Sequence, residues 1–198
     1  MIKFESLKTE NFLVRKYEPA DAEALFEIFS DADTMKYVES PFDFEKTCAF
    51  MQRYGFGDNP KVFALIYDKS KHICSRHING KRLMGHIIFH PYADKELEQN
   101  HGKNMVWELG FVLHKDFQGQ GIATKLTHTF IDYAKQRGIK ALILECDPNN
   151  VQMIRLAEHF LFKQYNDIND NAENNSNNSQ KDSDKCGKLL CYILELYP

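Results

Sequence analysis

The sequence lacks a long apolar run. Its first residues, Met1 to Ser6, contain no continuous apolar core of the kind that a secretory signal carries. No segment approaches the roughly 18 consecutive apolar residues that a membrane-spanning helix needs. We therefore expect a cytoplasmic protein that has no membrane as partner.

Two further classes of protein are disfavoured by what is missing. The 5 cysteines form neither a CxxC pair nor a cluster with histidine at zinc-ligand spacing, so we expect reduced thiols and no metal. The 25 basic and 28 acidic residues are mixed along the chain and leave a net charge of -3. Without a basic stripe, we expect no nucleic-acid partner.

What is present indicates one compact domain. The 198 residues are 43% hydrophobic and 13% aromatic, which is enough to bury one sizeable core. We expect a single domain over residues 1–198. A tract at 166–185, rich in Asn, Asp and Ser, has almost nothing to bury and predicts a flexible loop.

Hydrophobic periodicity predicts an alternation of strands and helices. Period-two or continuous apolar runs predict strands, and 3.6-residue spacing predicts helices. The expected strands are 12–15, 62–67, 83–89, 105–114, 141–146 and 189–196, and the expected helices begin near Pro19 and cover 44–54, 121–137 and 151–160. Asn79-Gly80 predicts a hairpin turn between two antiparallel strands.

This order predicts the fold class. The early strands are antiparallel and the later part contains a β-α-β crossover. We therefore expect an α+β fold with α/β-type layers, in which a mixed central β-sheet is flanked by helices on both faces.

The segment from Leu113 to Thr124 runs from a strand through a glycine loop into a helix. Glycines allow consecutive backbone N–H groups to point into one concavity, and the helix N-terminus adds partial positive charge, so such a loop suits a pyrophosphate. The loop matches neither the P-loop, which needs Gly-Lys-Ser/Thr, nor GxGxxG. On glycine spacing alone, a plain strand-to-helix turn remains the simpler interpretation.

Several segments together resemble the GNAT N-acetyltransferases, whose hallmark is Gln/Arg-x-x-Gly-x-Gly/Ala between a strand and a long helix. Gln118-Gly119-Gln120-Gly121-Ile122-Ala123 fits that hallmark. The resemblance extends from Thr9 to Phe162 and is nearest to the branch that includes the ribosomal-protein N-terminal acetyltransferases. Its other segments are Thr9 to Arg15, Asp21-Ala22, Phe29 to Asp31, Trp107 to Leu113, and Asn150 to Phe162.

The resemblance implies acetyl-CoA as cosubstrate and identifies the residues that would bind it. The backbone of the central strand would pair with the pantetheine arm, and the amides of the glycine loop would hold the pyrophosphate. An asparagine near the pantetheine matches Asn150, although a simple helix cap explains it as well. The residues implied are Phe111, Val112, Leu113, Gln118, Gly119, Gln120, Gly121, Ile122, Ala123, Thr124 and Asn150.

Acetyl transfer to an amine needs a base, because the ammonium must lose a proton before it attacks. Glu108 is the candidate, since it lies in mid-strand on the face that carries Val106 and Gly110. The alternative is a carboxylate that fixes the fold or binds the amine without taking its proton. His114 at the strand end is the second choice as base.

The sequence departs from the resembled family where the leaving thiolate is protonated. Ala157 stands where many members have tyrosine, Met153 where this branch often has serine, and Leu161 where glycine is usual. No general acid is therefore assigned. Cys146, Tyr165 and Tyr192 are conceivable donors, but core or surface packing explains each of them more simply.

The resemblance implies an N-acetyltransferase acting on the primary amine of a small molecule or of a protein N-terminus, as a monomer or a homodimer. The departures at Met153 and Ala157 leave open a non-catalytic acyl-CoA-binding module. A protein-interaction domain without cofactor is a third possibility, but it leaves the glycine loop unexplained.

Overall fold

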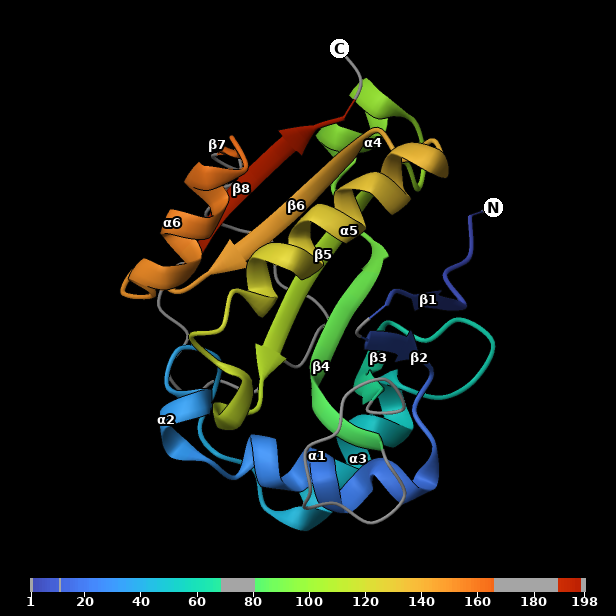
Figure 1. The fold of residues 1–198 in the computed structure, drawn as a ribbon. Coiled ribbons are helices and arrows are strands. Elements are labelled where there is room, and N and C mark those ends of the chain that lie inside the picture. Colours follow the sequence, from blue (N-terminus) through green and yellow to red (C-terminus); the bar gives the residue numbers. More distant parts are fainter. Residues whose placement is uncertain (1, 11, 69–80, 166–188, 197–198) are drawn as a thin grey trace, which may run out of the picture.

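The computed structural model describes residues 2–10, 12–68, 81–165 and 189–196. Figure 1 shows their arrangement. In chain order the elements are β1 (Ser6–Lys8), β2 (Phe12–Arg15), a 3-10 turn (Pro19–Asp21), α1 (Ala22–Phe29), α2 (Ala32–Met35), α3 (Phe44–Tyr54), β3 (Val62–Asp68), β4 (Lys81–Pro91), α4 (Lys95–His101), β5 (Val106–Leu113), a second 3-10 turn (Lys115–Phe117), α5 (Ile122–Gln136), β6 (Ala141–Cys146), α6 (Val151–His159), β7 (Lys163–Gln164) and β8 (Leu190–Glu195).

The strands form one 8-stranded sheet in the order β1-β2-β3-β4-β5-β6-β8-β7. Among the described strands, every neighbouring pair is antiparallel except β5 and β6, which are parallel and joined through α5. The prediction of a mixed sheet, antiparallel early and with a late β-α-β crossover, is confirmed.

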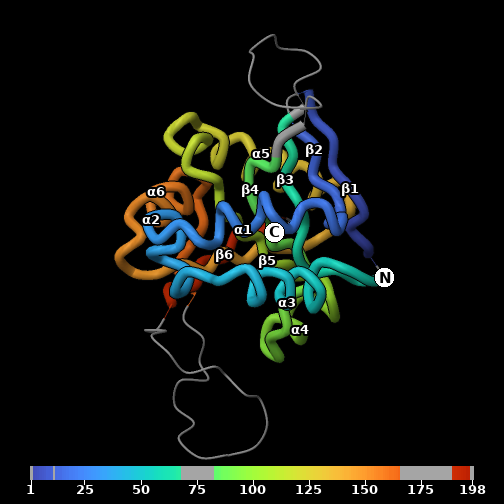
Figure 2. The backbone as a smooth tube through the Cα atoms, turned by 90° about the horizontal axis from the view of Figure 1, so that it is seen from below, coloured from blue at the N-terminus to red at the C-terminus, as the bar shows by residue number. Residues whose placement is uncertain are grey.

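Helices cover both faces of this sheet. Figures 1 and 2 show α5 on one side of the strands and α3 with α4 on the other. The period-two pattern of β5 explains this layering, because successive side chains point to opposite faces. Trp107, Leu109 and Leu113 are buried in the core under α5, while Val112 packs with α1 and α3, and Val106 packs with α4.

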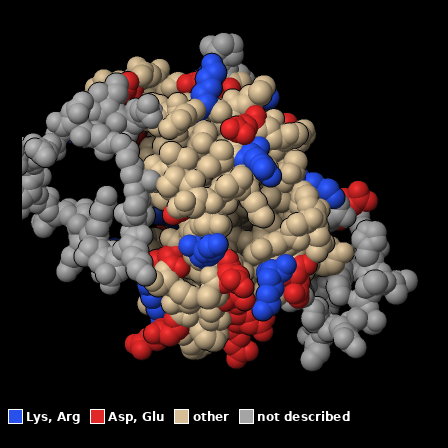
Figure 3. Space-filling view, turned by 90° about the vertical axis from the view of Figure 1, so that its left-hand side faces the viewer, with Lys and Arg blue, Asp and Glu red and all other residues tan. Residues whose placement is uncertain are grey.

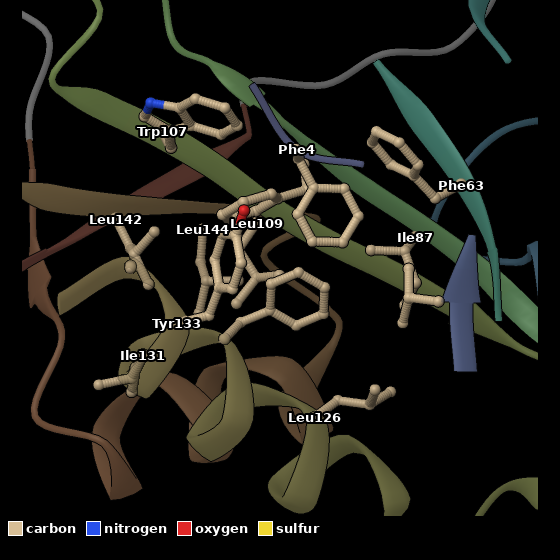
Figure 4. Close-up of a cluster of buried hydrophobic side chains, with 14 of the residues drawn as sticks. Phe4, Phe63, Ile87, Trp107, Leu109, Leu126, Ile131, Tyr133, Leu142 and Leu144 are labelled. Atoms are coloured by element: carbon tan, nitrogen blue, oxygen red, sulfur yellow. The ribbon is translucent and has the colours of Figure 1, made fainter. Parts of the chain in front are cut away.

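The core beneath α5 contains a group of aromatic rings in contact with one another (Figure 4). Ring centroids lie 4.7 Å apart for Phe89 and Trp107, 4.7 Å for Phe89 and Phe130, and 4.6 Å for Phe4 and Phe63. Buried aromatic side chains contribute large apolar areas with defined geometry. This packing fixes α5 across the central strands, and so it fixes where the helix begins.

A buried polar pair lies in the core on the opposite face. The hydroxyl of Tyr17 lies 2.9 Å from Nδ1 of His86 on β4, and the imidazole packs edge-on against Phe29 of α1 and Phe50 of α3. Burial lowers the pKa of His86 to about 3, so its ring is neutral at physiological pH. The pair therefore links the helices to β4 without a buried charge.

Three short elements and one longer helix were not expected from the sequence. α4 lies between the expected strands 83–89 and 105–114, where no helix was predicted, and the Asp94 side chain accepts a hydrogen bond of 2.7 Å from the Leu97 amide. Leu97 is the buried residue of this helix, and one apolar residue gives no periodicity to detect. β1, α2 and β7 are too short to show a period.

β4 is longer than predicted. We expected His90-Pro91 to end the strand, but β4 continues through Pro91, which lies opposite Trp107 of β5. Proline is tolerated at a strand end because its missing N–H costs no central ladder bond there. The difference matters because it places His90 in the strand, directly opposite Glu108.

Two predictions fall on residues outside the described part of the chain. They are the turn at Asn79-Gly80 and the flexible loop at 166–185. The strands before and after the predicted turn, β3 and β4, do pair antiparallel, with Asp68 opposite Lys81.

Leu161 follows α6 in the left-handed backbone region, with φ 62, and is 78% exposed. This conformation costs a residue with a Cβ roughly 1–2 kcal/mol and costs glycine almost nothing. It explains why the resembled family usually has glycine at this position. The leucine gains little from packing to offset the cost.

We predict that Leu161→Gly raises the free energy of unfolding by about 1 kcal/mol, because relief of strain exceeds the extra entropy of glycine in the unfolded chain. Urea unfolding followed by circular dichroism measures the change. Leu161→Ala is the control, since it removes the side chain but keeps the strain, and it should give no gain. An equal gain in both variants would assign the effect to the exposed side chain.

Candidate active site

The central feature of the site is a gap between two strands. β5 and β6 pair only from Val106 opposite Ala141 to Glu108 opposite Ile143. β5 nevertheless continues to Leu113, where it still pairs with Gly85 of β4. Beyond Glu108 the two parallel strands diverge (Figure 1), so among the described residues one side of β5 has no strand partner.

The direction of the backbone groups decides which residues face this gap. The His114 amide donates a 2.8 Å hydrogen bond to the Met84 carbonyl of β4. Alternate residues of a strand direct their backbone groups to the same side, so Val112 also bonds to β4 while Phe111 faces the gap. The Leu113 carbonyl, on the gap side, accepts a 2.8 Å bond from the Gln118 side chain. Among the three residues expected to pair with pantetheine, Phe111 therefore directs both backbone groups into the gap, and Leu113 directs its N–H there beside the carbonyl that Gln118 occupies.

The gap opens into a cleft of about 780 Å³. Residues of α2, the end of β5, the start of α5 and α6 line it. Ten of the eleven residues expected to bind a cofactor are among them: Phe111, Val112, Leu113, Gln118, Gly119, Gly121, Ile122, Ala123, Thr124 and Asn150. Gln120 is exposed and its side chain turns back to donate to the Asp116 carbonyl at 2.6 Å.

The glycine loop needs glycine for its conformation rather than for space. Gly119 and Gly121 have φ 69 and 71, and a Cβ on either would meet nothing within 4 Å. Gly121 is the N-cap of α5, and no side chain caps the helix. The first N–H groups of a 15-residue helix are therefore left for a ligand at the cleft wall, where the helix dipole favours negative charge.

Side chains from α2 hold this loop in place. Lys115 Nζ lies 3.2 Å from Asp31 Oδ2, and the Gln118 amide nitrogen lies 3.4 Å from the Thr34 hydroxyl. Hydrogen bonds from Thr34 and then from Lys115 lower the pKa of Asp31 to about 2. α2 thus borders the cleft and also supports the loop across it.

Asn150 has the structural role that the sequence left open. Its side chain accepts a 3.2 Å hydrogen bond from the Met153 amide and so caps α6. Asn150 also lines the cleft, together with Met153. Its contact with a cofactor stays a prediction.

Glu108 lies at the last paired position before the gap and its side chain is 18% exposed. Burial, and after it the negative charge of Glu145 on β6, raises the pKa of Glu108 to about 7, while Lys61 acts in the opposite direction. Gly110 is the next residue on the same face, and the side chain of Ile88 from β4 packs against it. Glu108 itself is not among the residues that line the cleft, which begins three residues further along β5 at Phe111. A carboxylate that titrates near neutrality is suited to proton transfer, and its reach to a substrate stays a prediction.

His114, the alternative base, lies far from Glu108. Six residues along a strand span about 20 Å. Its Nδ1 accepts a 3.1 Å hydrogen bond from the Asp116 amide at the start of a 3-10 turn, and the residue is buried. The two side chains therefore do not serve the same reacting atom.

The three conceivable proton donors for the leaving thiolate are not among the residues that line the cleft. Burial raises the pKa of both Cys146 and Tyr192. The Tyr165 hydroxyl lies 3.5 Å from Asp94 Oδ1. Nothing in these positions assigns a general acid.

The sequence did not indicate the groups around Glu108. His90 Nε2 lies 3.2 Å from Glu108 Oε2, and the Tyr92 hydroxyl donates to Glu145 Oε1 at 2.7 Å. These residues come from strands β4 and β6 and the residue after β4, so their proximity depends on strand register. Extending the predicted strand by two residues would have included His90, but only the register of the ladder places it opposite Glu108.

Figure 3 shows the surface from the side of α6 and α2, with acidic and basic side chains interspersed on it. The described residues of this face therefore form no broad basic surface that would attract a phosphate ligand from a distance. Within the part of the chain that the structure describes, no helix has the length and apolar character to cross a membrane.

Comparison with known proteins gives consistent results. A model of the acetyltransferase (GNAT) domain matches residues 11–163. The uncharacterized N-acetyltransferase YnaD of Bacillus subtilis is 28% identical over 152 residues, which are 76% of this chain and 78% of that protein. N-alpha-acetyltransferase 30 of Schizosaccharomyces pombe is 39% identical over 51 residues, or 26% of this chain and 34% of that protein.

Solved structures share the fold. A GNAT-family acetyltransferase from Bacillus anthracis superposes with a TM-score of 0.68 at 24% identity, covering 96% of this chain and 98% of that one. A GCN5-related N-acetyltransferase from Brucella melitensis gives a TM-score of 0.67 at 16% identity, covering 97% and 79%. At these identities the likeness concerns the fold alone.

We predict that the Glu108 carboxyl titrates with a midpoint near 7 and that Glu145→Gln lowers this midpoint, because it removes a negative charge that favours the protonated form. Carbon-13 NMR of labelled glutamate measures the titration. Glu195→Gln is the control, because it removes the same charge from β8, where Glu195 lies opposite Ala141 at the other end of the β6–β8 ladder. A midpoint that Glu145→Gln leaves unchanged would contradict the assigned cause.

Proposed function

The chain belongs to the GNAT acetyltransferase family, and we propose that it transfers the acetyl group of acetyl-CoA to a primary amine of a small molecule or a protein N-terminus. The observation that carries the proposal is the junction of two features in one cleft. The unpaired side of β5 meets the glycine loop at the start of α5.

The residues of the cleft fit the chemistry of acetyl-CoA. The backbone of Phe111 offers a donor and an acceptor to the amides of an extended pantetheine arm, as an added strand would. The free N–H groups at Gly121 and the first turn of α5 suit the pyrophosphate. When bound, acetyl-CoA supplies the acetyl group as an activated thioester.

Glu108 is the proposed general base. It lies three residues before Phe111, about 10 Å along the strand, on the side of the sheet away from α5. An ammonium that reaches the carboxylate would lose a proton to it, directly or through water. The neutral amine then has the lone pair that acyl transfer requires.

The alternative is an acyl-CoA-binding module without catalysis, which Met153 and Ala157 motivate. A panel of amines with acetyl-CoA, read by release of free thiol, separates the two. The panel includes peptides with free N-termini, since N-alpha-acetyltransferase 30 is among the relatives. Release that depends on an amine supports the proposal, and tight binding without release on any amine supports the module.

We predict that Gly121→Asp weakens acetyl-CoA binding at least tenfold, while Gly121→Asn weakens it much less. Both side chains tolerate the left-handed conformation, φ 71, and they have nearly the same shape. They differ in the negative charge placed at the helix N-terminus. Isothermal titration calorimetry compares the two, and equal affinities would place the pyrophosphate elsewhere.

We predict that Glu108→Gln lowers turnover by about 10²- to 10⁴-fold with little change in acetyl-CoA affinity, because only proton transfer is removed. The acidic limb of the pH-rate profile, expected near pH 7, should disappear with it. Free-thiol release, measured with an amine that the panel identifies as a substrate, provides the rates. Normal turnover across pH would make Glu108 a structural carboxylate.

A further inference from the structure

His90 contacts Glu108 from the neighbouring strand. The two residues lie directly opposite each other in the β4–β5 ladder, and their side chains share a face. His90 Nε2 is 3.2 Å from Glu108 Oε2, and both side chains are mostly buried, at 19% and 18% exposure. The other ring nitrogen, Nδ1, lies 2.9 Å from the Pro91 carbonyl oxygen.

These two contacts determine where the protons are. A carbonyl oxygen only accepts hydrogen bonds, so Nδ1 of His90 carries a hydrogen and donates it. In the neutral ring Nε2 is then an acceptor. A neutral His90 and an ionised Glu108 would direct two acceptors at each other across 3.2 Å, so the contact is favourable only when it contains a proton.

We propose that Glu108 and His90 hold one proton in common, so that the pair, rather than Glu108 alone, is the base of this active site. His90 is a positioning residue that acts through Glu108. The catalytic part of this proposal rests on the proposed acetyltransferase function, whereas the shared proton does not.

The surroundings favour a pair that is neutral overall. Burial raises the pKa of Glu108 and lowers that of His90, so the proton is drawn toward the carboxyl. Glu145, which accepts from Tyr92, raises both pKa values, and exposed Lys61 lowers both. The effects of these two charges oppose each other. The protonation state of the pair therefore depends on burial and on the contact between Glu108 and His90.

The proton balance of the reaction follows from this arrangement. Above the midpoint the contact lacks its proton, and an ammonium beside Glu108 restores it by giving up one N–H. The C–N bond then forms as the C–S bond breaks, and the second nitrogen proton ends on the thiol of coenzyme A. The pair returns its own proton to water.

NMR of the free protein tests the shared proton without any acceptor. Nitrogen-15 spectra of labelled histidine report the tautomer and titration of His90, and carbon-13 spectra report Glu108. We expect Nδ1 to stay protonated at all pH values, and Nε2 and the carboxyl to titrate with one common midpoint. An Nε2–H tautomer above that midpoint, or two unrelated midpoints, would overturn the proposal.

His90→Gln gives the second measurement. The glutamine amide donates to the carboxylate without a titrating proton, so the Glu108 midpoint should fall by about one pH unit, as expected when a coupled partner is removed. The matched control is His128→Gln, which removes an exposed histidine 3.2 Å from Asp132 on α5 and should leave the midpoint unchanged. An unchanged midpoint in His90→Gln would overturn the proposal, and if this variant does not fold, the wild-type tautomer decides.

The activity readout is the pH profile of kcat/KM. With a substrate amine, the acidic limb should move to lower pH in His90→Gln by the same amount as the NMR midpoint. A purely structural role would lower the rate at all pH values and leave the limb in place. If the NMR results hold but Glu108→Gln turns over normally, the shared proton stands and the catalytic role of Glu108 fails.

Discussion

The divergence of β5 from β6 is the constraint on which the site depends. At the paired end, Val106, Ala141 and Ile143 pack with Leu97 in a small buried cluster that holds the two strands together. Past Glu108 that cluster ends, and β4 is the one described strand that still pairs with β5. The same strand therefore contributes a rigid carboxylate at one end of the gap and free backbone at the other.

β4 must approach closely to hold an otherwise one-sided strand. Gly85 makes this possible, since a Cβ there would lie 2.6 Å from the Val112 carbonyl oxygen. On the opposite surface, the aromatic core positions α5 so that its first turn meets the end of β5. The conformation of the glycine loop is restricted by its contacts, because the Gln118 side chain bonds to Thr34 of α2 and to the Leu113 carbonyl of β5.

The sequence predicted the features that repeat or that carry a local signal. The period of two in β5 assigned its residues to the correct faces, and the run from Ile122 to Gln136 showed its helical spacing over several turns. The glycine loop was recognisable because its residues are consecutive. What remained hidden depends on residues far apart in the chain. His90 meets Glu108 only through strand register, and α4 is secured by one cap and one buried leucine.

The unpaired side of β5 is, in effect, a sheet edge inside the molecule. Exposed sheet edges promote aggregation, because another extended chain can form hydrogen bonds with their unpaired backbone groups. Here residues of α2, α5 and α6 line the cleft beside the edge, so its backbone groups face a ligand cleft. A linear arm with amides along it can form the hydrogen bonds of the missing strand and so close the edge.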